Sequence, residues 1–201
     1  MTLPKILLFD LGGVIVPWVG LSALASITGL PRDTVIARFA GSETFRRYER
    51  GQTDDAEFIR EFKRLFSLTA PNADIPVLWN SWVHAPYPDT ARVLAELRPR
   101  FTTAALTNTN ALHWAHVNQL IDCHASFDHV FASHEIHAAK PDVESYTIPL
   151  TAMDTAPEDV WFFDDTMDNI DAARALGMTA FHVDRAVGVI PTLTSLKLIS
   201  S

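Results

Sequence analysis

Short apolar runs that end in polar residues recur along the chain and predict the strands of a buried sheet. Continuous apolar runs of this length are typical of strands covered on both faces, as in parallel sheets. Between them lie helical patterns, one of which opens at 88–90 and stops before Pro99, while another spans 169–176 and is closed by Gly177. The predicted strands are 5–10, 101–106, 129–132, 160–163 and 178–183. Strands that alternate with helices indicate βαβ units and a parallel sheet.

Residues 17–86 interrupt this alternation and contain no convincing strand. Their pattern predicts short helices at 32–40, 43–50 and 54–66, and the last has its phenylalanines on one face, which we interpret as core packing. We therefore expect an α/β fold with a Rossmann-like parallel sheet flanked by helices. Residues 1–16 and 87–201 would form this core, and residues 17–86 would be a small helical cap inserted after the first strand.

Composition agrees with one globular domain that carries an insertion. The chain has 201 residues, of which 48% are hydrophobic, and a length near this value suits one domain with a sizeable insertion. The single cysteine excludes an intrachain disulfide framework and fits a reducing compartment. A formal net charge of −8 gives no electrostatic footprint for nucleic acid. A phosphate-bearing substrate would therefore need a local cationic site.

The uncharged stretch between Asp10 and Arg32 is long enough to span a bilayer, and Ser22–Ser26 could pass for a signal-peptidase site. Asp10 and the Gly and Pro residues of this stretch speak against a spanning helix. We expect a cytoplasmic protein without a membrane anchor.

Polar residues follow several of the predicted strands. Asp10 ends the first, Thr107-Asn108 and Asp164-Asp165 end two others, and Lys140 comes a short loop after a fourth. In open parallel sheets ligands bind at the carboxyl ends of the strands, so these side chains can converge on one crevice. Carboxylates, a hydroxyl and an ammonium are what Mg²⁺-assisted phosphoryl transfer requires.

Each of these residues also has an ordinary structural interpretation. A strand that ends in Asp often caps the next turn or helix, and Thr107-Asn108 could be a simple turn. Lys140 could be a solvated loop lysine, and the carboxylates at 164–171 could be an acidic first turn of a helix. Taken together, these interpretations do not explain why polar residues recur at strand ends in this order.

The ordered set resembles the haloacid dehalogenase-like (HAD) hydrolase superfamily. Its four motifs are matched by FDLGGV at 9–14, LTN at 106–108, Lys140-Pro141 and FDDTMDN at 163–169, and 17–86 matches the cap of the first cap class. Within that cap, ERG at 49–51 and DDAEF at 54–58 resemble the branch that contains bacterial α-D-glucose-1-phosphate phosphatase. The match covers most of the chain.

The resemblance implies a Mg²⁺ site and a covalent mechanism. Asp10 would be the nucleophile that forms an aspartyl-phosphate. Asp10, Asp164 and the Gly12 carbonyl would hold Mg²⁺, with Asp165 in or just behind that shell. Asp168 would orient Lys140 or a metal-bound water.

The same resemblance implies how phosphate is bound. Thr107, Lys140 and the loop at Gly12 and Asn108 would contact the phosphate, with the Thr107 hydroxyl and the Asn108 backbone N–H donating to its oxygens. Lys140 would neutralise the charge that Asp10 shares with the phosphate and so belongs to the catalytic set. One lysine and one Mg²⁺ would make the crevice locally positive.

Gly12 departs from the usual pattern, because most HAD phosphatases have a second Asp there that protonates the leaving alcohol. Such proton donation contributes about 10²–10⁴-fold to the rate. An anomeric hydroxyl departs easily, and the glucose-1-phosphatase branch also has Gly here, so a sugar 1-phosphate is the preferred substrate prediction. Otherwise Glu49, His84, His113 or a water could replace the acid, or the protein could bind phosphate compounds and turn them over poorly.

Three features leave alternatives open. The cap residues Trp18, Phe39, Phe45, Tyr48 and Arg47 could line the site or form the core of the cap. Two histidine pairs with a spacing of three, 113/116 and 134/137, could share a metal but have no further ligand nearby. Cys123 could be a nucleophile or a packing residue, and we interpret it as a packing residue.

The resulting hypothesis is a Mg²⁺-dependent hydrolase of a small phosphate monoester, with no nucleic-acid or membrane partner. The sequence leaves the oligomeric state undecided between a monomer and a weak dimer. A 2-haloacid dehalogenase with the same Asp10 nucleophile is one alternative, although its substrate carboxylate would face an acidic fourth motif without a cation. A non-catalytic protein that binds phosphate ligands is the other, because of Gly12.

Overall fold

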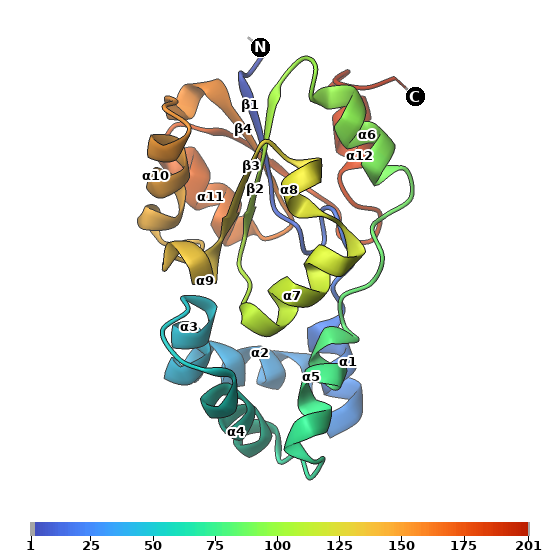
Figure 1. The fold of residues 1–201 in the computed structure, drawn as a ribbon, viewed down its shortest axis with the longest axis vertical. Helices are drawn as coiled ribbons and strands as arrows, with labels where there is room; N and C mark the ends of the chain where they lie inside the picture. The colour runs from blue at the N-terminus through green and yellow to red at the C-terminus, as the bar shows by residue number, and fades with distance from the viewer. Residues whose placement is uncertain (1–2, 201) are drawn as a thin grey trace.

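The computed structural model describes residues 3–200 and is built on a five-stranded parallel sheet (Figure 1). The strand order is β3-β2-β1-β4-β5, and every neighbouring pair is parallel. The strands are β1 (Ile6–Phe9), β2 (Thr102–Thr107), β3 (His129–Ala132), β4 (Val160–Asp164) and β5 (Thr179–His182). The expected α/β class and parallel sheet are confirmed.

Side chains of the central strand alternate between two hydrophobic cores. Leu7 and Phe9 pack with the first group of helices, and Ile6 and Leu8 pack with the second group on the opposite face. The first group is α6 (Thr90–Leu97), α7 (Ala111–Leu120), α8 (Cys123–Ser126) and α12 (Ile190–Ser195), and the second is α10 (Val143–Ala152) and α11 (Met167–Ala175). Because both faces are covered, polar groups at the strand ends are the accessible part of the sheet.

Residues 17–86 form helices that lie beyond the carboxyl ends of the strands (Figure 1), and we call them the helical insertion. Phe62 is fully buried in a hydrophobic cluster of their own, where it contacts Phe45, Phe58 and Trp79. The elements are α1 (Gly20–Thr28), α2 (Arg32–Gly41), α3 (Glu43–Glu49), α4 (Asp55–Phe66), the 3₁₀ turn η1 (Asn72–Asp74) and α5 (Ile75–Asn80). Asp54 caps α4 by accepting a 2.8 Å hydrogen bond from the Glu57 backbone N–H.

The structure also contains helices that the sequence pattern did not predict, namely α1, α5, α10 and α12, together with the single-turn α8 and α9 (Ser133–Ile136). α1 has no charged residue to mark a polar face, and α10 includes Pro149, which sequence rules treat as a helix breaker. The helix predicted from residue 169 begins earlier, at Met167, so Asp168 lies in its first turn. No helix within residues 3–200 is both long and apolar enough to cross a membrane.

Candidate active site

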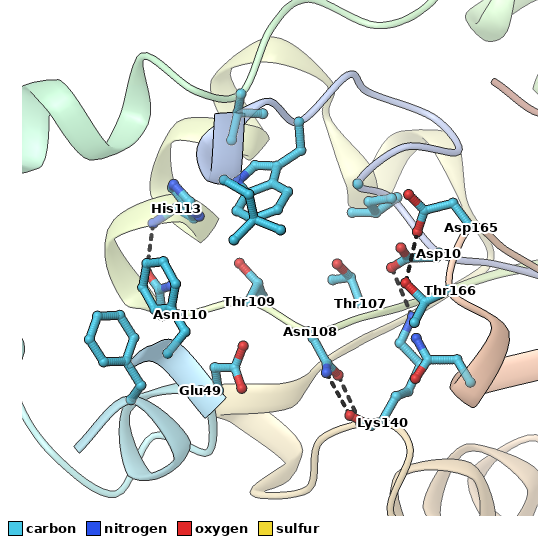
Figure 2. A pocket seen from close by; sticks show the side chains of 18 of the residues that line it. Asp10, Glu49, Thr107, Asn108, Thr109, Asn110, His113, Lys140, Asp165 and Thr166 are labelled. Atoms are coloured by element: carbon cyan, nitrogen blue, oxygen red, sulfur yellow. Dashed lines mark hydrogen bonds and ion pairs between the residues drawn. The ribbon is translucent and has the colours of Figure 1, made fainter. Parts of the chain in front are cut away.

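A buried lysine joins two carboxylates at the carboxyl end of the sheet. The Lys140 Nζ lies 2.9 Å from Asp10 Oδ1 and 2.6 Å from Asp164 Oδ2, and it donates a 2.9 Å hydrogen bond to the Leu106 carbonyl. The side chains of Lys140 and Asp164 are 1% and 0% exposed. β1 ends just before Asp10 and β4 ends at Asp164, while β2 supplies the carbonyl. The parallel sheet therefore assembles residues that are far apart in sequence into one ion-paired centre (Figure 2).

Asp164 is held from the following helix as well. Its Oδ1 accepts hydrogen bonds from the Thr166 backbone N–H at 2.8 Å and from the Asn169 Nδ2 at 3.0 Å. Asp168 lines the cavity but makes no hydrogen bond to Lys140 within residues 3–200, and Asp10 and Asp164 hold that ammonium instead. The alternative that Asp168 orients a metal-bound water stays a prediction. The sequence analysis did not single out Asn169, whose amide completes the set of donors around Asp164.

Asp165 occupies a different position from its neighbour. Its Oδ2 pairs with Arg185 at 2.6 Å, and its carboxylate lies against the backbone of the loop after β1. A Cβ on Gly13, which has φ +79°, would come within 2.1 Å of that Oδ2, so this close approach requires glycine. Asp165 lines the cavity, whereas Asp164 is not part of its wall in the described structure. Arg185 is a site residue that the sequence analysis missed, because it lies in a loop without a motif.

The Asn108 side chain fixes the loop that carries the lysine. Its Nδ2 donates to the Lys140 carbonyl and its Oδ1 accepts from the Lys140 backbone N–H, both at 2.8 Å. Thr107 is buried at the end of β2 and faces the cavity beside Asp10 (Figure 2). The resemblance predicted that the Asn108 backbone N–H donates a hydrogen bond to phosphate. The structure shows in addition that the Asn108 side chain holds the backbone of Lys140.

Burial and charge act in opposite directions on this centre. Burial raises the pKa of Asp10 to about 7, supported by the nearby Asp164 and Asp165 carboxylates and opposed by Lys140. Burial disfavours the Lys140 ammonium, but Asp10 and Asp164 outweigh it and raise the pKa of Lys140 above its usual range. Burial also raises the pKa of Asp165, against the attraction of Arg185. The lysine is therefore a permanent cation in a site crowded with carboxylates.

This crowding fits a divalent cation. Asp10, Asp164 and Asp165 each offer a carboxylate oxygen, and the three oxygens lie within 4.8 Å of one another. Mg²⁺ prefers an octahedron of oxygen ligands at about 2.0–2.1 Å, which places neighbouring ligands about 3 Å apart and opposite ligands about 4 Å apart. Small adjustments of these side chains would bring them into range. Lys140 and Arg185 together offset two of the three carboxylate charges, so the donor set suits a hard cation.

A cavity of about 470 Å³ extends from this centre to the helical insertion. Of the insertion residues weighed from the sequence, Trp18, Phe39, Phe45 and Tyr48 line it. Arg47 is not part of the wall in the described structure, and its guanidinium instead donates to the Gln52 carbonyl at 2.8 Å.

The three candidates for a replacement acid fall into different environments. His84 is exposed and outside the cavity wall of the described residues. His113 stacks on Trp79, places its Nε2 2.9 Å from the Trp79 carbonyl, and has its pKa lowered to about 4 by burial. Glu49 lines the cavity, and Figure 2 shows its carboxylate on the side of Asn108 and Thr109. Of the three, Glu49 is the one that lines the cavity and whose pKa is raised by burial.

Gly12 lines the cavity and has room for a side chain. A Cβ there would meet only the Trp18 Cβ, at 3.7 Å, which is ordinary van der Waals contact. The absence of a carboxylate at this position is therefore not imposed by a clash at the Cβ.

Other nucleophiles and ligands weighed from the sequence lie apart from this centre. Cys123 is buried, and burial raises the pKa of its thiol to about 12, which agrees with a packing role. Among residues 3–200, Asp10, Asp164 and Asp165 are the one group of three or more His, Cys, Asp or Glu residues that could hold a metal. Neither histidine pair belongs to such a group.

Comparisons with known proteins indicate the family to which this chain belongs. Residues 4–177 match the family model described as haloacid dehalogenase-like hydrolase. The chain is 34% identical over 191 residues to Phosphatase MT3486 of Mycobacterium tuberculosis, covering 86% of this chain and 84% of that protein. It is 27% identical to the sesquiterpene phosphatase astK of Aspergillus oryzae, covering 96% of each chain. A magnesium complex of a HAD family enzyme from Bacteroides thetaiotaomicron has the same fold, with a TM-score of 0.78, 23% identity, and coverage of 92% of this chain and 95% of that one.

Proposed function

The chain belongs to the haloacid dehalogenase-like hydrolase family, and we propose that it is a Mg²⁺-dependent phosphatase that cleaves a small phosphate monoester. The observation that carries this proposal is the Asp10–Lys140–Asp164 centre with Asp165 beside it. A nucleophilic carboxylate, a fixed ammonium and a carboxylate metal site are the groups that phosphoryl transfer uses. The names of the two phosphatase relatives support the same choice.

The proposed reaction has two steps. An Asp10 oxygen attacks phosphorus while the ester P–O bond breaks, which gives an aspartyl-phosphate and an alcohol once the leaving oxygen takes a proton. Water then attacks the same phosphorus, loses a proton, and releases inorganic phosphate and the Asp10 carboxylate. Lys140 and the Thr107 hydroxyl stabilise the charge on the phosphoryl oxygens.

Asp10 and Asp165 are the side chains that would hold Mg²⁺ from the cavity, with the Gly12 carbonyl as a further ligand. Asp165 lines the cavity, whereas Asp164 lies outside its wall in the described structure and is engaged by Lys140, Thr166 and Asn169. Asp164 would therefore act chiefly by fixing Lys140. On binding the metal, Asp165 would share its carboxylate with Arg185 and the Thr166 hydroxyl. When bound, Mg²⁺ supplies positive charge that neutralises the phosphate and orients it for in-line attack.

The helical insertion would serve as a cap that excludes water and selects the substrate. Assignment to the glucose-1-phosphate phosphatase branch of the first cap class, a sugar 1-phosphate substrate and a cytoplasmic location remain predictions from the sequence. The fold is shared with L-2-haloacid dehalogenase of Xanthobacter autotrophicus, with a TM-score of 0.66 and 19% identity. The test therefore includes a dehalogenase substrate.

The test is a Mg²⁺-dependent assay of p-nitrophenyl phosphate and glucose 1-phosphate, with 2-chloropropionate as a parallel substrate. We expect phosphate release that stops with EDTA and returns with added Mg²⁺. Phosphate release that EDTA leaves unchanged would exclude the metal assignment. Halide release without Mg²⁺ would establish the dehalogenase, and phosphate binding without any turnover would establish the non-catalytic alternative.

A further inference from the structure

The wall that the helical insertion contributes to the cavity consists mainly of hydrocarbon. It is supplied by apolar side chains from α1, α2, α3, α5 and the segment before α1, including those of Trp18, Leu21, Ile36, Phe39, Phe45 and Trp79. These residues continue the wall that begins at Asp10 and Lys140, so a substrate whose phosphate lies at Asp10 extends its leaving group along them. The leaving group is therefore surrounded chiefly by apolar surface.

Most polar side chains near this wall are already engaged within the protein, and the Glu49 carboxylate is an exception among the described residues. Arg46 donates to Glu43 and to the Ala40 carbonyl, and the Tyr48 hydroxyl donates to Asp55 at 2.6 Å. Asn110 accepts a 3.1 Å hydrogen bond from the His113 backbone N–H, and the His113 ring is bonded to the Trp79 carbonyl. A sugar presents several hydroxyl groups, each of which loses free energy when it is buried without a partner. This wall offers such groups few free partners.

We infer that the natural leaving group is an apolar alcohol, that is, an alkyl, prenyl or aryl alcohol esterified to phosphate. This inference rests on the proposed phosphatase function and names its substrate class. A cavity of about 470 Å³ is within the range of sites that enclose ligands of drug size, so the chamber can take a hydrocarbon chain of substantial length.

The test is a series of n-alkyl phosphates from ethyl to octyl, assayed below their critical micelle concentrations. All release a primary alcohol, so the chemistry of the leaving oxygen stays constant while the apolar area grows. We expect kcat/KM to rise roughly three- to fourfold for each added methylene until the chamber is filled. Hexyl phosphate should exceed glucose 6-phosphate, which has the same carbon number and also leaves as a primary alcohol, by about tenfold or more.

A matched pair of variants distinguishes the effect of the cavity wall from the effect of the rest of the helical insertion. Ile36 of α2 lines the cavity, whereas Ile27 of α1 is 51% exposed and lies outside the wall of the described structure. Ile36→Asn should flatten the rise of kcat/KM with chain length, and Ile27→Asn should leave that rise unchanged. A flat series in the wild type, or a preference for either glucose phosphate, would overturn the apolar assignment. If p-nitrophenyl phosphate and every other ester were inert, the phosphatase proposal itself would fail.

A second inference comes from the contacts of the segment around Glu49. The Ser133 hydroxyl lies 2.7 Å from the Glu49 carbonyl, and Arg50 pairs with Asp142 at 2.5 Å. The next residue, Gly51, has φ +63°, and a Cβ there would come within 2.2 Å of the His134 carbonyl. These contacts fix the end of α3 against the α/β core at the edge of the cavity.

The Glu49 carboxylate has no partner in the part of the chain that the structure describes. It accepts no hydrogen bond and forms no ion pair within residues 3–200, and it faces the cavity (Figure 2). We propose that Glu49 is the general acid that replaces the carboxyl group missing at Gly12. Its proton goes to the ester oxygen as the P–O bond breaks. The resulting carboxylate then takes a proton from the water that attacks the aspartyl-phosphate, which restores the acid.

Electrostatics agree with this role. Burial raises the pKa of Glu49, against the attraction of Arg50. The charged or titratable side chains that share the cavity wall with Glu49 are those of Asp10, Arg46, Tyr48, His113, Lys140, Asp165, Asp168 and Arg185. Helix α9, which packs against α3, adds His134 and Glu135. A raised pKa keeps the acid form to higher pH, and kcat/KM for an alkyl phosphate should fall as pH rises through that pKa.

The leaving group provides the decisive readout for Glu49→Gln. An alkoxide needs a proton to depart, whereas p-nitrophenolate does not. The variant should lower kcat for hexyl phosphate about 10²-fold or more and remove the alkaline fall described above, while the first-turnover burst of p-nitrophenol changes little. Glu144→Gln, on an exposed position of α10 outside the cavity wall of the described residues, is the control and should leave both substrates unchanged. Equal losses for both substrates, or no loss for hexyl phosphate, would exclude Glu49 as the acid.

Discussion

The two ends of the cavity are constructed in different ways. At the sheet, the Lys140 ammonium has two carboxylates and a carbonyl within 2.9 Å, and the Asn108 amide pairs with the lysine backbone. At the helical insertion, aromatic and aliphatic side chains form the wall, and the Glu49 carboxylate is left without a partner within the described residues.

This difference shows how chemistry and selectivity are divided. Buried charges are tolerated only when each has close partners, so the sheet end can change little without losing its function. An apolar wall holds its ligand through non-directional burial, so it can change shape while the fold is retained. The variants below test that division, beginning with the largest expected effect on free energy.

Replacing the nucleophile should abolish turnover and leave the fold intact. Asp10→Asn keeps the size of the side chain and leaves Lys140 paired with Asp164, but it removes the attacking oxyanion. We expect kcat for p-nitrophenyl phosphate to fall roughly 10⁴-fold or more. Circular dichroism should match the wild type, and Asp171→Asn, an exposed pair partner of Arg174, is the control. Activity retained by Asp10→Asn would refute the covalent mechanism.

Truncating the centre of the insertion should reduce stability rather than change the chemistry at the sheet. Phe62→Ala removes a fully buried ring that packs on Phe58 and Trp79, and such losses cost about 3–5 kcal/mol. Urea unfolding followed by tryptophan fluorescence measures the change. Phe62→Leu retains most of the buried hydrocarbon and should lose less than half as much, and equal losses would contradict the packing role.

Loosening the lysine loop should have a smaller, purely kinetic effect. Asn108→Ala removes both hydrogen bonds to the Lys140 backbone. A displacement of about 1 Å at a catalytic group costs about 10²-fold, so kcat should fall between about 10- and 100-fold, with a lesser change in KM. Asn72→Ala removes a hydrogen bond that the Lys63 ammonium donates to an exposed amide oxygen outside the cavity wall of the described residues, and it serves as the control. A change confined to KM would argue that Asn108 only contacts substrate.

Restoring the usual carboxyl group should have the smallest effect. A Cβ at Gly12 meets only Trp18, at 3.7 Å, so Gly12→Asp is expected to fold. If Glu49 already supplies the proton, kcat for hexyl phosphate and glucose 1-phosphate should stay within about threefold of Gly12→Asn, the isosteric control without an acid. A rise of about 10²-fold would mean that the wild-type site lacks an acid, and Glu49 would lose its role.

Much of the sheet end was predictable because strand patterns are local. A buried strand is mostly apolar along its length, so the polar residue that ends it is visible in the sequence, as at Asp10, Thr107 and Asp164. The side chains that hold these groups were less visible. Asn169 and Arg185 acquire their roles only from their distance to Asp164 and Asp165.

The insertion was less predictable, for a related reason. The α4 pattern is strongly amphipathic and predicted its helix to within one residue, whereas α1 has no charged residue and was weighed as a membrane segment. A stripe of phenylalanines shows that one face of a helix is buried, but it does not identify the surface against which that face packs. Phe45 belongs to the insertion's hydrophobic cluster and also lines the cavity, so both interpretations of that residue were correct.

The sequence by itself determined the class of fold, the order of the strand-end residues and the absence of an acid at Gly12, because these follow from local periodicity and residue identity. Only the tertiary structure decided which of two adjacent carboxylates faces the cavity, which residue holds Lys140, and where the Glu49 carboxylate points. Those properties depend on distances between segments far apart in sequence. Burial and pKa follow from these distances, because the free energy of a charge is set by what surrounds it.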